Sequence, residues 1–129
     1  MRILLADDQI EVRSALRLLL EQEADLDIVG EAAEADDLVY QTLMATPDVL
    51  LLDWELAGSR AADLIARLRA IAPHLRIIAL SGRPEARRQA LRLGADAFVS
   101  KVEPPERLLM AVNSLRTLDH HRQENACVG

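Results

Sequence analysis

Short aliphatic runs alternate with longer stretches of helical periodicity along the chain. The aliphatic runs cover residues 3–6, 26–30, 49–52, 77–80 and 97–99. Their Val, Ile and Leu residues follow one another without in–out alternation, which is typical of parallel strands that are covered on both faces. The pattern therefore predicts five short, buried strands.

Between these runs, apolar residues recur about every 3.6 positions, which predicts helices. The predicted helices cover residues 10–23, 36–45, 64–71 and 85–93, and a fifth begins at Pro104–Pro105. Pro73 ends the third helix, because proline lacks the amide donor that a helix interior needs, and Gly94 suits a left-handed turn after the fourth. Alternating strands and helices predict an α/β fold, a doubly wound five-stranded parallel sheet in a single domain. The alternative, an all-helical bundle, is disfavoured because the apolar runs are too short for buried helices.

Composition narrows the class of protein. The chain has 129 residues, of which 50% are hydrophobic and 28% charged, as in one globular domain. Its net charge of -6 repels phosphate backbones and anionic lipids, so we expect no direct nucleic-acid binding and no membrane association. Asp7 and Asp8 follow the first apolar run too soon for a signal peptide, and Cys127 has no cysteine partner. We therefore expect a cytoplasmic protein.

Polar residues stand where the predicted strands end. Asp7 and Asp8 follow the first strand, Asp53 the third, Ser81 the fourth and Lys101 the fifth. The carboxyl ends of parallel strands meet at one edge of a sheet. Three neighbouring carboxylates repel one another unless a hard cation lies between them, and oxygen ligands suit Mg²⁺. Taken singly, each residue has an ordinary structural interpretation, such as a helix cap or a solvated charge. Together they indicate phosphoryl chemistry, with an aspartate as nucleophile and with lysine and serine offsetting the charge.

In these residues the chain resembles the receiver domain of bacterial two-component response regulators. The resemblance covers residues 2–118 and rests on segments 3–8, 47–53, 80–82 and 94–101, and segment 27–32 resembles receivers that precede helix-turn-helix output domains. It implies a flavodoxin-like (βα)5 receiver fold over residues 1–118. Residues 119–129 are polar and patternless, so we expect a flexible tail or the start of a linker. The protein is then either a stand-alone receiver or a fragment of a longer regulator.

The resemblance implies a phosphorylation-activated signalling switch. Asp53 would accept a phosphoryl group from a histidine kinase, a phosphotransfer protein or a small donor. Its self-phosphorylation and self-dephosphorylation would be its only activities, and it would control a partner or an output domain. Lys101 and Ser81 would contact the phosphoryl group, and Ser81 and Phe98 would reposition on activation. The implied Mg²⁺ ligands are Asp7, Asp8, Asp53 and the backbone carbonyl of Glu55.

Two departures from the family pattern keep other functions open. Ala57 and Ala61 stand where the family usually has Pro and Gly, so the loop after Asp53 is expected to differ in shape. One alternative is a receiver-like interaction domain that is not phosphorylated. Another is a Mg²⁺-dependent phosphohydrolase, in which Glu55 would have to replace the usual aspartate acid. A flavin-binding domain of the same fold is disfavoured, because Asp7 and Asp8 would repel the flavin phosphate.

Partner surfaces are suggested by the predicted helices. Leu18 lies almost opposite the core residue Leu16, and we predict that Leu18 and Glu11 form a kinase-docking face; an isolated exposed leucine is the ordinary alternative. Four arginines suggest a surface for an acidic partner or for a homodimer, although a solvated basic face explains them equally simply. They are Arg83, Arg87, Arg88 and Arg92.

Three further predictions concern residues near the site and in the tail. Glu55 and Arg83 are expected to pair across the mouth of the pocket and to control water entry and the lifetime of the acyl phosphate. Trp54 follows Asp53, so its fluorescence should report Mg²⁺ or phosphate binding. His120 and His121 have no third ligand nearby in the sequence and are expected to be solvated.

Overall fold

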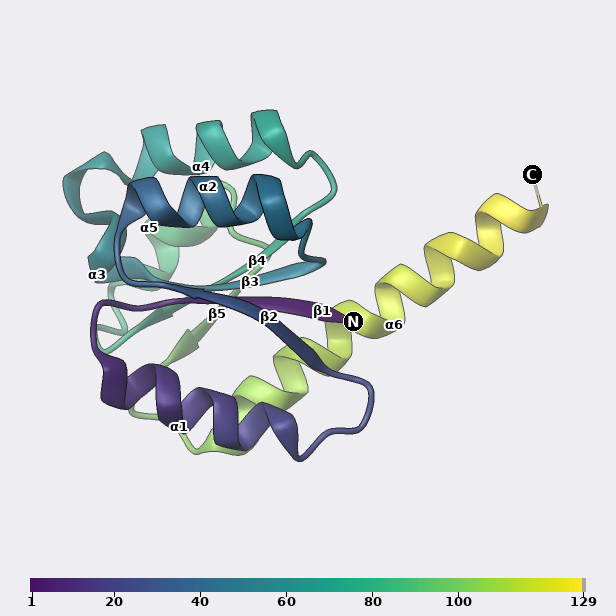
Figure 1. Cartoon of the computed structure of the whole chain (residues 1–129), viewed down its shortest axis with the longest axis horizontal. Helices are drawn as coiled ribbons and strands as arrows, with labels where there is room; N and C mark the ends of the chain where they lie inside the picture. Colours follow the sequence, from purple (N-terminus) through teal and green to yellow (C-terminus); the bar gives the residue numbers. More distant parts are fainter. Residues whose placement is uncertain (129) are drawn as a thin grey trace.

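The computed structural model describes the backbone of residues 1–128 and the side chains of residues 1–116. One parallel sheet runs through the molecule in the order β2-β1-β3-β4-β5 (Figure 1). The strands are β1 (Arg2–Ala6), β2 (Asp27–Ala32), β3 (Val49–Asp53), β4 (Arg76–Ser81) and β5 (Ala97–Ser100). Each begins and ends within two residues of its predicted run. The predicted doubly wound, flavodoxin-like sheet is confirmed.

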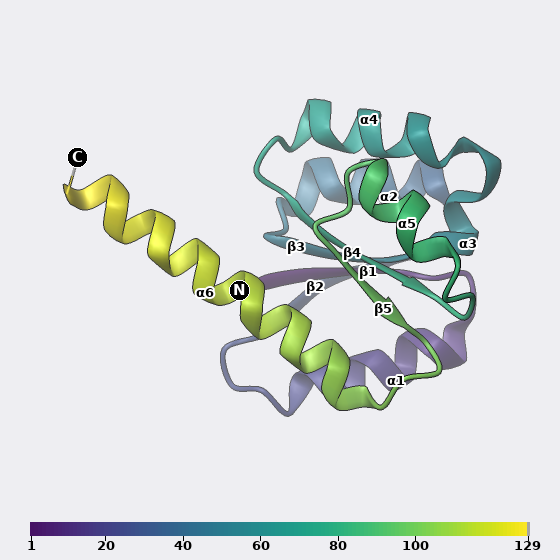
Figure 2. The ribbon, with the colours of Figure 1, turned by 180° about the vertical axis from the view of Figure 1, so that it is seen from behind.

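Helices cover both faces of this sheet, as the uninterrupted aliphatic strands predicted. Figures 1 and 2 show α2, α4 and α5 on one face and α1 and α6 on the other. The helical elements are α1 (Ile10–Glu21), α2 (Ala35–Ala45), α3 (Trp54–Ala57), the 3-10 helix η1 (Gly58–Arg60), α4 (Ala61–Ile71), α5 (Ala86–Arg92) and α6 (Pro105–Val128). Gly94 follows α5 with a φ of 116°, a left-handed conformation that glycine adopts without strain, as predicted.

The core has two layers, one on each side of the sheet. Along β3, Leu50 and Leu52 point into the layer beneath α2 and α4, whereas Val49 and Leu51 point into the layer beneath α1 and α6. All four side chains are fully buried. Burial on both faces explains why the strands contain no alternating polar positions.

The chain after β3 is helical rather than an open loop. The short helix α3 follows Asp53 at once, and η1 leads into α4. Ala57 ends α3 and Ala61 begins α4, and alanine has the highest helix propensity of all residues. The expected change of shape after Asp53 is therefore a helical one.

The backbone of residues 119–128 is also helical, which the polar, patternless sequence did not predict. It continues α6, and the chain contains no proline or glycine between Glu106 and Val128 to end that helix. Figure 2 shows the C-terminal half of α6 extending away from the sheet. The domain boundary at residue 118 stays a prediction, and His120, His121 and Cys127 lie outside the described side chains.

Within the described chain, every helix is too short or too polar to cross a membrane.

Candidate functional site

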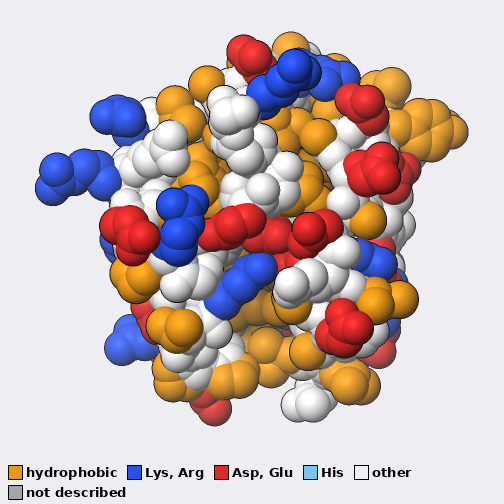
Figure 3. Space-filling view, turned by 90° about the vertical axis from the view of Figure 1, so that its left-hand side faces the viewer, with side chains coloured by type: hydrophobic (Ala, Val, Ile, Leu, Met, Phe, Trp, Pro, Cys, Tyr) orange, Lys and Arg blue, Asp and Glu red, His pale blue; other side chains and the backbone are white. Residues whose placement is uncertain are grey.

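The strand order places the predicted acidic residues side by side. Strands β1 and β3 are neighbours, and Ala6 pairs with Leu52, so Asp7 and Asp53 leave the sheet together. Carboxylate oxygens of Asp7, Asp8 and Asp53 all lie within 4.8 Å of one another. Figure 3 views this edge of the molecule and shows acidic side chains gathered in a band across its middle, with basic side chains above and below.

Lys101 joins two of these carboxylates. Its ammonium nitrogen Nζ lies 2.9 Å from Oδ2 of Asp7 and 3.1 Å from Oδ1 of Asp53. The backbone amide of Lys101 donates to the carbonyl of Ser81 at 2.8 Å, which fixes the start of the lysine side chain beside β4. The buried ends of β1, β3 and β5 thus carry an ion-paired cluster.

The remaining hydrogen bonds distinguish the two buried aspartates. Both oxygens of Asp7 are engaged, because Oδ1 accepts the amide of Gln9 at 2.9 Å and Oδ2 accepts Lys101. In Asp53, Oδ1 accepts Lys101 and the amide of Glu55, at 3.2 Å, and caps α3. Within the described residues, Oδ2 of Asp53 accepts no hydrogen bond. Asp53 therefore keeps one uncommitted carboxylate oxygen.

Burial controls the charge of this cluster. It raises the pKa of Asp53 to about 6, with a further contribution from the negative charge of Asp7, although Lys101 acts in the opposite direction. Burial alone would lower the pKa of Lys101, but its hydrogen bonds to Asp7 and Asp53 raise that pKa overall. Lys101 therefore stays an ammonium group, while Asp53 lacks enough positive charge around it to be fully stabilised as a carboxylate.

The donor set fits a hard divalent cation. Asp7 and Asp53 are buried, Asp8 is exposed, and among the described residues this is the group of potential metal ligands that lies close enough to share an ion. All its donor atoms are carboxylate oxygens, and the exposed side leaves room for water, as Mg²⁺ requires. The carbonyl of Glu55 as a further ligand stays a prediction.

Ser81 is engaged by a residue that the sequence did not link to it. Its Oγ donates to Oε1 of Glu55 at 2.6 Å and accepts the amide of Arg83 at 3.0 Å. Nε of Arg83 lies 3.2 Å from the same Glu55 oxygen, so the predicted pair of Glu55 and Arg83 is in contact. Burial raises the pKa of Glu55, but hydrogen bonds from Ser81 and Arg83 lower it overall, and Glu55 is ionised.

Two aromatic residues border the site. Phe98 is buried on β5, and the guanidinium carbon of Arg87 lies 6.0 Å from the centre of its ring. Such a cation–π contact was not predicted, because it depends on how α5 packs over β5. Trp54 is buried directly after Asp53, and its Nε1 donates to Oε1 of Gln89 at 3.2 Å. The fluorescence response of Trp54 stays a prediction.

The predicted docking residues lie apart from the acidic cluster. Glu11 borders a groove of about 430 Å³ between α1 and the segment that joins β5 to α6. Leu18 lies further along α1 with 68% of its surface exposed. The four arginines of the predicted basic surface, Arg83, Arg87, Arg88 and Arg92, are all exposed.

Comparison with known proteins places these features in a family context. A family model described as the response regulator receiver domain matches residues 3–113. The nitrate/nitrite response regulator NarL of Escherichia coli K12 is 29% identical over 113 residues, which are 86% of this chain and 52% of NarL. The transcriptional regulatory protein DesR of Bacillus subtilis is 28% identical over 88% of this chain and 57% of its own length. The chain spans about half the length of these relatives.

Solved structures give the same picture. The isolated receiver (REC) domain of RcsB from Salmonella enterica serovar Typhimurium, in the presence of the phosphomimetic BeF3-, superposes with a TM-score of 0.81 at 27% identity. That superposition covers 91% of this chain and 88% of the RcsB domain. A LuxR-family response regulator from Aurantimonas matches with a TM-score of 0.81 at 28% identity, over 88% of this chain and 83% of its own.

Proposed function

Because this chain belongs to the response regulator receiver domain family of two-component systems, we propose that it is a signalling switch that is turned on by phosphorylation of Asp53. The observation that carries the proposal is the arrangement around Asp53. Its free oxygen Oδ2 lies in a cluster that holds two further aspartates and the ammonium group of Lys101. That combination supplies a nucleophile together with the positive charge that phosphoryl transfer requires.

The uncommitted oxygen of Asp53 is the proposed nucleophile. It attacks the phosphorus of a phosphohistidine or acyl phosphate donor, the bond from phosphorus to the donor breaks, and Asp53 becomes an acyl phosphate. Lys101 then pairs with a phosphoryl oxygen, and Ser81 exchanges Glu55 for another. Asp7, Asp8 and Asp53 would hold Mg²⁺, which when bound supplies positive charge that offsets repulsion between the carboxylates and the donor phosphate. Asp7 is the poorer nucleophile, because both its oxygens already accept hydrogen bonds.

The partners belong to the same proposal. We propose that a histidine kinase or phosphotransfer protein is the donor and that it contacts Glu11 and Leu18 on α1, both of which are exposed. Homodimerisation and control of transcription are further proposals, the latter supported by relatives named as transcriptional regulators. We expect no direct nucleic-acid contact by this domain because its net charge is -6. A single cysteine and the acidic composition support work in the cytoplasm.

Intact mass spectrometry tests the proposal. The protein is mixed with Mg²⁺ and acetyl phosphate, and we expect a gain of one phosphoryl group. Asp53→Asn should abolish the gain. Asp48→Asn is the matched control, because Asp48 precedes the same strand at its opposite end and binds the amide of Arg2. An unmodified wild-type protein would favour the interaction domain instead. Rapid multiple turnover of a phosphate ester would favour a phosphohydrolase.

A further inference from the structure

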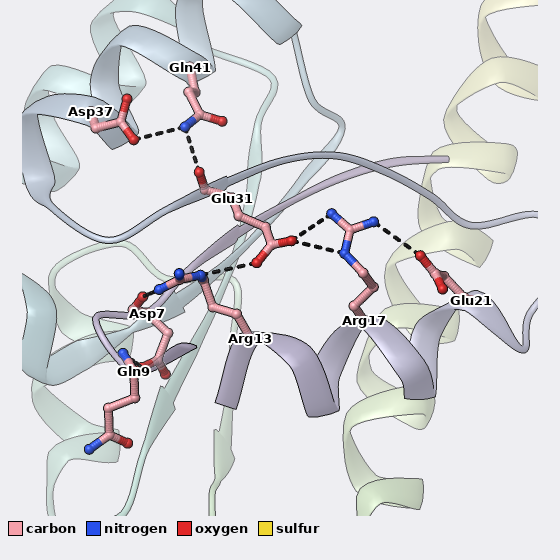
Figure 4. Close-up of polar contacts among 8 residues, drawn as sticks. All are labelled: Asp7, Gln9, Arg13, Arg17, Glu21, Glu31, Asp37 and Gln41. Carbon is pink, nitrogen blue, oxygen red and sulfur yellow. Dashed lines mark hydrogen bonds and ion pairs between the residues drawn. The ribbon is translucent and has the colours of Figure 1, made fainter. Parts of the chain in front are cut away.

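Arg13 on α1 lies behind the acidic residues and reaches in two directions at once. Its Nη1 donates to the backbone carbonyl of Asp7 at 2.6 Å, and its Nε lies 3.0 Å from Oε1 of Glu31 on β2 (Figure 4). Only 14% of the Arg13 side chain is exposed. A guanidinium group suits this task, because its donors form a rigid fork that an ammonium group lacks.

The carbonyl that Arg13 binds belongs to the peptide unit between Asp7 and Asp8. On the other side of Asp7, its amide donates to the carbonyl of Ala32 at 3.0 Å. Both peptide units that flank Asp7 are therefore fixed, one by β2 and the other by Arg13. The carboxylate of Asp8 is exposed and forms no hydrogen bond or ion pair with the described residues. Its direction is thus determined by its backbone, which Arg13 holds.

The N-terminus of α1 makes this contact more important. Its N-cap residue, Gln9, has an extended backbone but forms no side-chain capping hydrogen bond. Asp8 lies between this uncapped helix start and the end of β1. Within this turn, the described contacts are the Gln9 amide to Oδ1 of Asp7 and Arg13 to the Asp7 carbonyl. Arg13 therefore restrains the turn on the side that Asp8 occupies.

Glu31 fixes Arg13 in turn. Arg17 binds Oε2 of Glu31 through Nε at 2.9 Å and through Nη2 at 2.7 Å. The backbone carbonyl of Glu31 accepts Nε2 of Gln41 at 2.5 Å, and Gln41 also binds Asp37 at 2.9 Å on α2 (Figure 4). Glu31 is thus held from α1 and from α2. It also neutralises Arg13, so Arg13 can hold the Asp7 carbonyl without strongly opposing a cation nearby.

We propose that Arg13 is a positioning residue for the divalent cation. By fixing the peptide unit between Asp7 and Asp8, it keeps the exposed Asp8 carboxylate in range of those of Asp7 and Asp53. The inference rests on the proposed function, because it assumes that this cluster binds Mg²⁺. It adds a residue that touches neither the cation nor the phosphoryl group.

Titration calorimetry of Mg²⁺ binding by the unphosphorylated full chain tests this role. We expect Arg13→Met to weaken Mg²⁺ binding about tenfold, the lower end of the range for residues that orient metal ligands. Arg13→Lys keeps the charge but has no fork to reach both partners, so we expect a smaller loss. Arg17→Met is the matched control. It breaks two contacts to Glu31 on the same helix but leaves the Asp7 carbonyl bound, so Mg²⁺ affinity should stay unchanged.

The opposite results are distinct. If Arg13 acted only through its charge, its removal would reduce repulsion and Arg13→Met would bind Mg²⁺ more tightly. If it were merely structural, Arg13→Met and Arg17→Met would both weaken binding in proportion to their loss of unfolding free energy. Either result would overturn the inference. If Arg13→Met fails to fold, Arg13→Lys decides, and wild-type affinity in that variant would refute the role. A wild-type protein that binds no Mg²⁺ would instead refute the metal site of the proposed function, and this inference with it.

Discussion

Glu55 is the residue whose side chain connects the interior of the site with its mouth. It accepts the Ser81 hydroxyl at 2.6 Å and pairs with Arg83 at 3.2 Å, and it follows the proposed phosphoacceptor by two positions. The pair is about half exposed, so its ionic contribution to stability is small. Its position indicates a kinetic role instead, at the path by which water reaches Asp53.

We predict that Glu55→Ala shortens the lifetime of the acyl phosphate. Without Glu55, Arg83 loses its partner at the mouth and water reaches the acyl phosphate more easily. An increase of about 2- to 10-fold in the dephosphorylation rate corresponds to a barrier lower by about 0.4–1.4 kcal/mol. Loss of the phosphoryl group is followed by intact mass after removal of the donor.

The control for this experiment is Glu85→Ala. Glu85 is an exposed acid just before α5, with no described contact to Ser81 or Glu55. It removes the same charge from nearby, and its rate should match the wild type. An unchanged rate in Glu55→Ala would rule out the proposed control of water entry.

At this scale, the sequence was sufficient for residues placed by the strands. Asp7, Asp53 and Lys101 come together because they end or follow neighbouring parallel strands. The contacts of Arg13 with the Asp7 carbonyl and of Ser81 with Glu55 were not predicted. They depend on side-chain rotamers and on the angle between α1 and the sheet, which periodicity does not determine.

Among the elements, α1 and β2 are joined by charge as well as by apolar packing. Glu31 on β2 binds Arg13 and Arg17 on α1, and 28% of its side chain is exposed. Burial raises the pKa of Glu31, but hydrogen bonds from the two arginines lower it overall, below its ordinary value of 4.5. These ion pairs therefore stabilise the fold at neutral pH.

The pH dependence of stability tests this link. A carboxyl group with a lowered pKa stabilises the folded state above its ordinary pKa, and this contribution is lost as the pH falls through the folded pKa. We expect Glu31→Gln to reduce the unfolding free energy by about 1 kcal/mol at pH 7. Its difference from the wild type should shrink once the pH falls below 4.5, measured by urea unfolding.

Glu21→Gln is the comparison for this measurement. Glu21 forms only an exposed pair with Arg17, four residues earlier on the same helix, so its removal should cost a few tenths of a kcal/mol. A pH-independent difference between Glu31→Gln and the wild type would show that the ion pairs do not stabilise the fold.

Element types were predicted better than element ends. The strands and the helices α1, α2, α4 and α5 follow from periodicity and from the proline and glycine positions. Two features differ, α3 with η1 after Asp53 and the continuation of α6 to Val128. In both, good helix formers extend a helix where no apolar stripe marks it, so a pattern of burial gives no signal.

For the whole molecule, the sheet separates two kinds of surface. Its carboxyl edge carries the acidic cluster, while α1 and α2 lie on opposite faces. Leu18 on α1 and Leu43 on α2 are both more than half exposed. The two leucines therefore allow one face of the domain to be tested against the other.

We predict that Leu18→Lys slows phosphoryl transfer from the cognate kinase but leaves phosphorylation by acetyl phosphate intact. A charged side chain within an apolar contact weakens the complex, whereas the reaction centre is untouched. Leu43→Lys is the matched control, and it should behave as the wild type in both assays. Equal loss in both assays for Leu18→Lys would reject the docking role.

The domain boundary can be tested by truncation. A chain that ends at Leu118 should keep the unfolding free energy and the Mg²⁺ affinity of the full chain. The α6 residues buried against the sheet are Leu108, Val112 and Leu115, which all precede the cut. Leu108→Ala, by contrast, should cost about 2–5 kcal/mol in urea unfolding. A truncated chain that loses more than about 1 kcal/mol would move the boundary towards the C-terminus.

Lys101 has a consequence for the whole switch, since one ammonium group serves two carboxylates at 2.9 and 3.1 Å. For every bond that a phosphoryl oxygen gains from Lys101, a carboxylate oxygen gives one up, and the exchange at Ser81 is similar. The number of polar contacts stays nearly constant, so the resting and signalling forms lie close in free energy. In such a balance, a partner that favours one form by about 1.4 kcal/mol changes the ratio of the two tenfold.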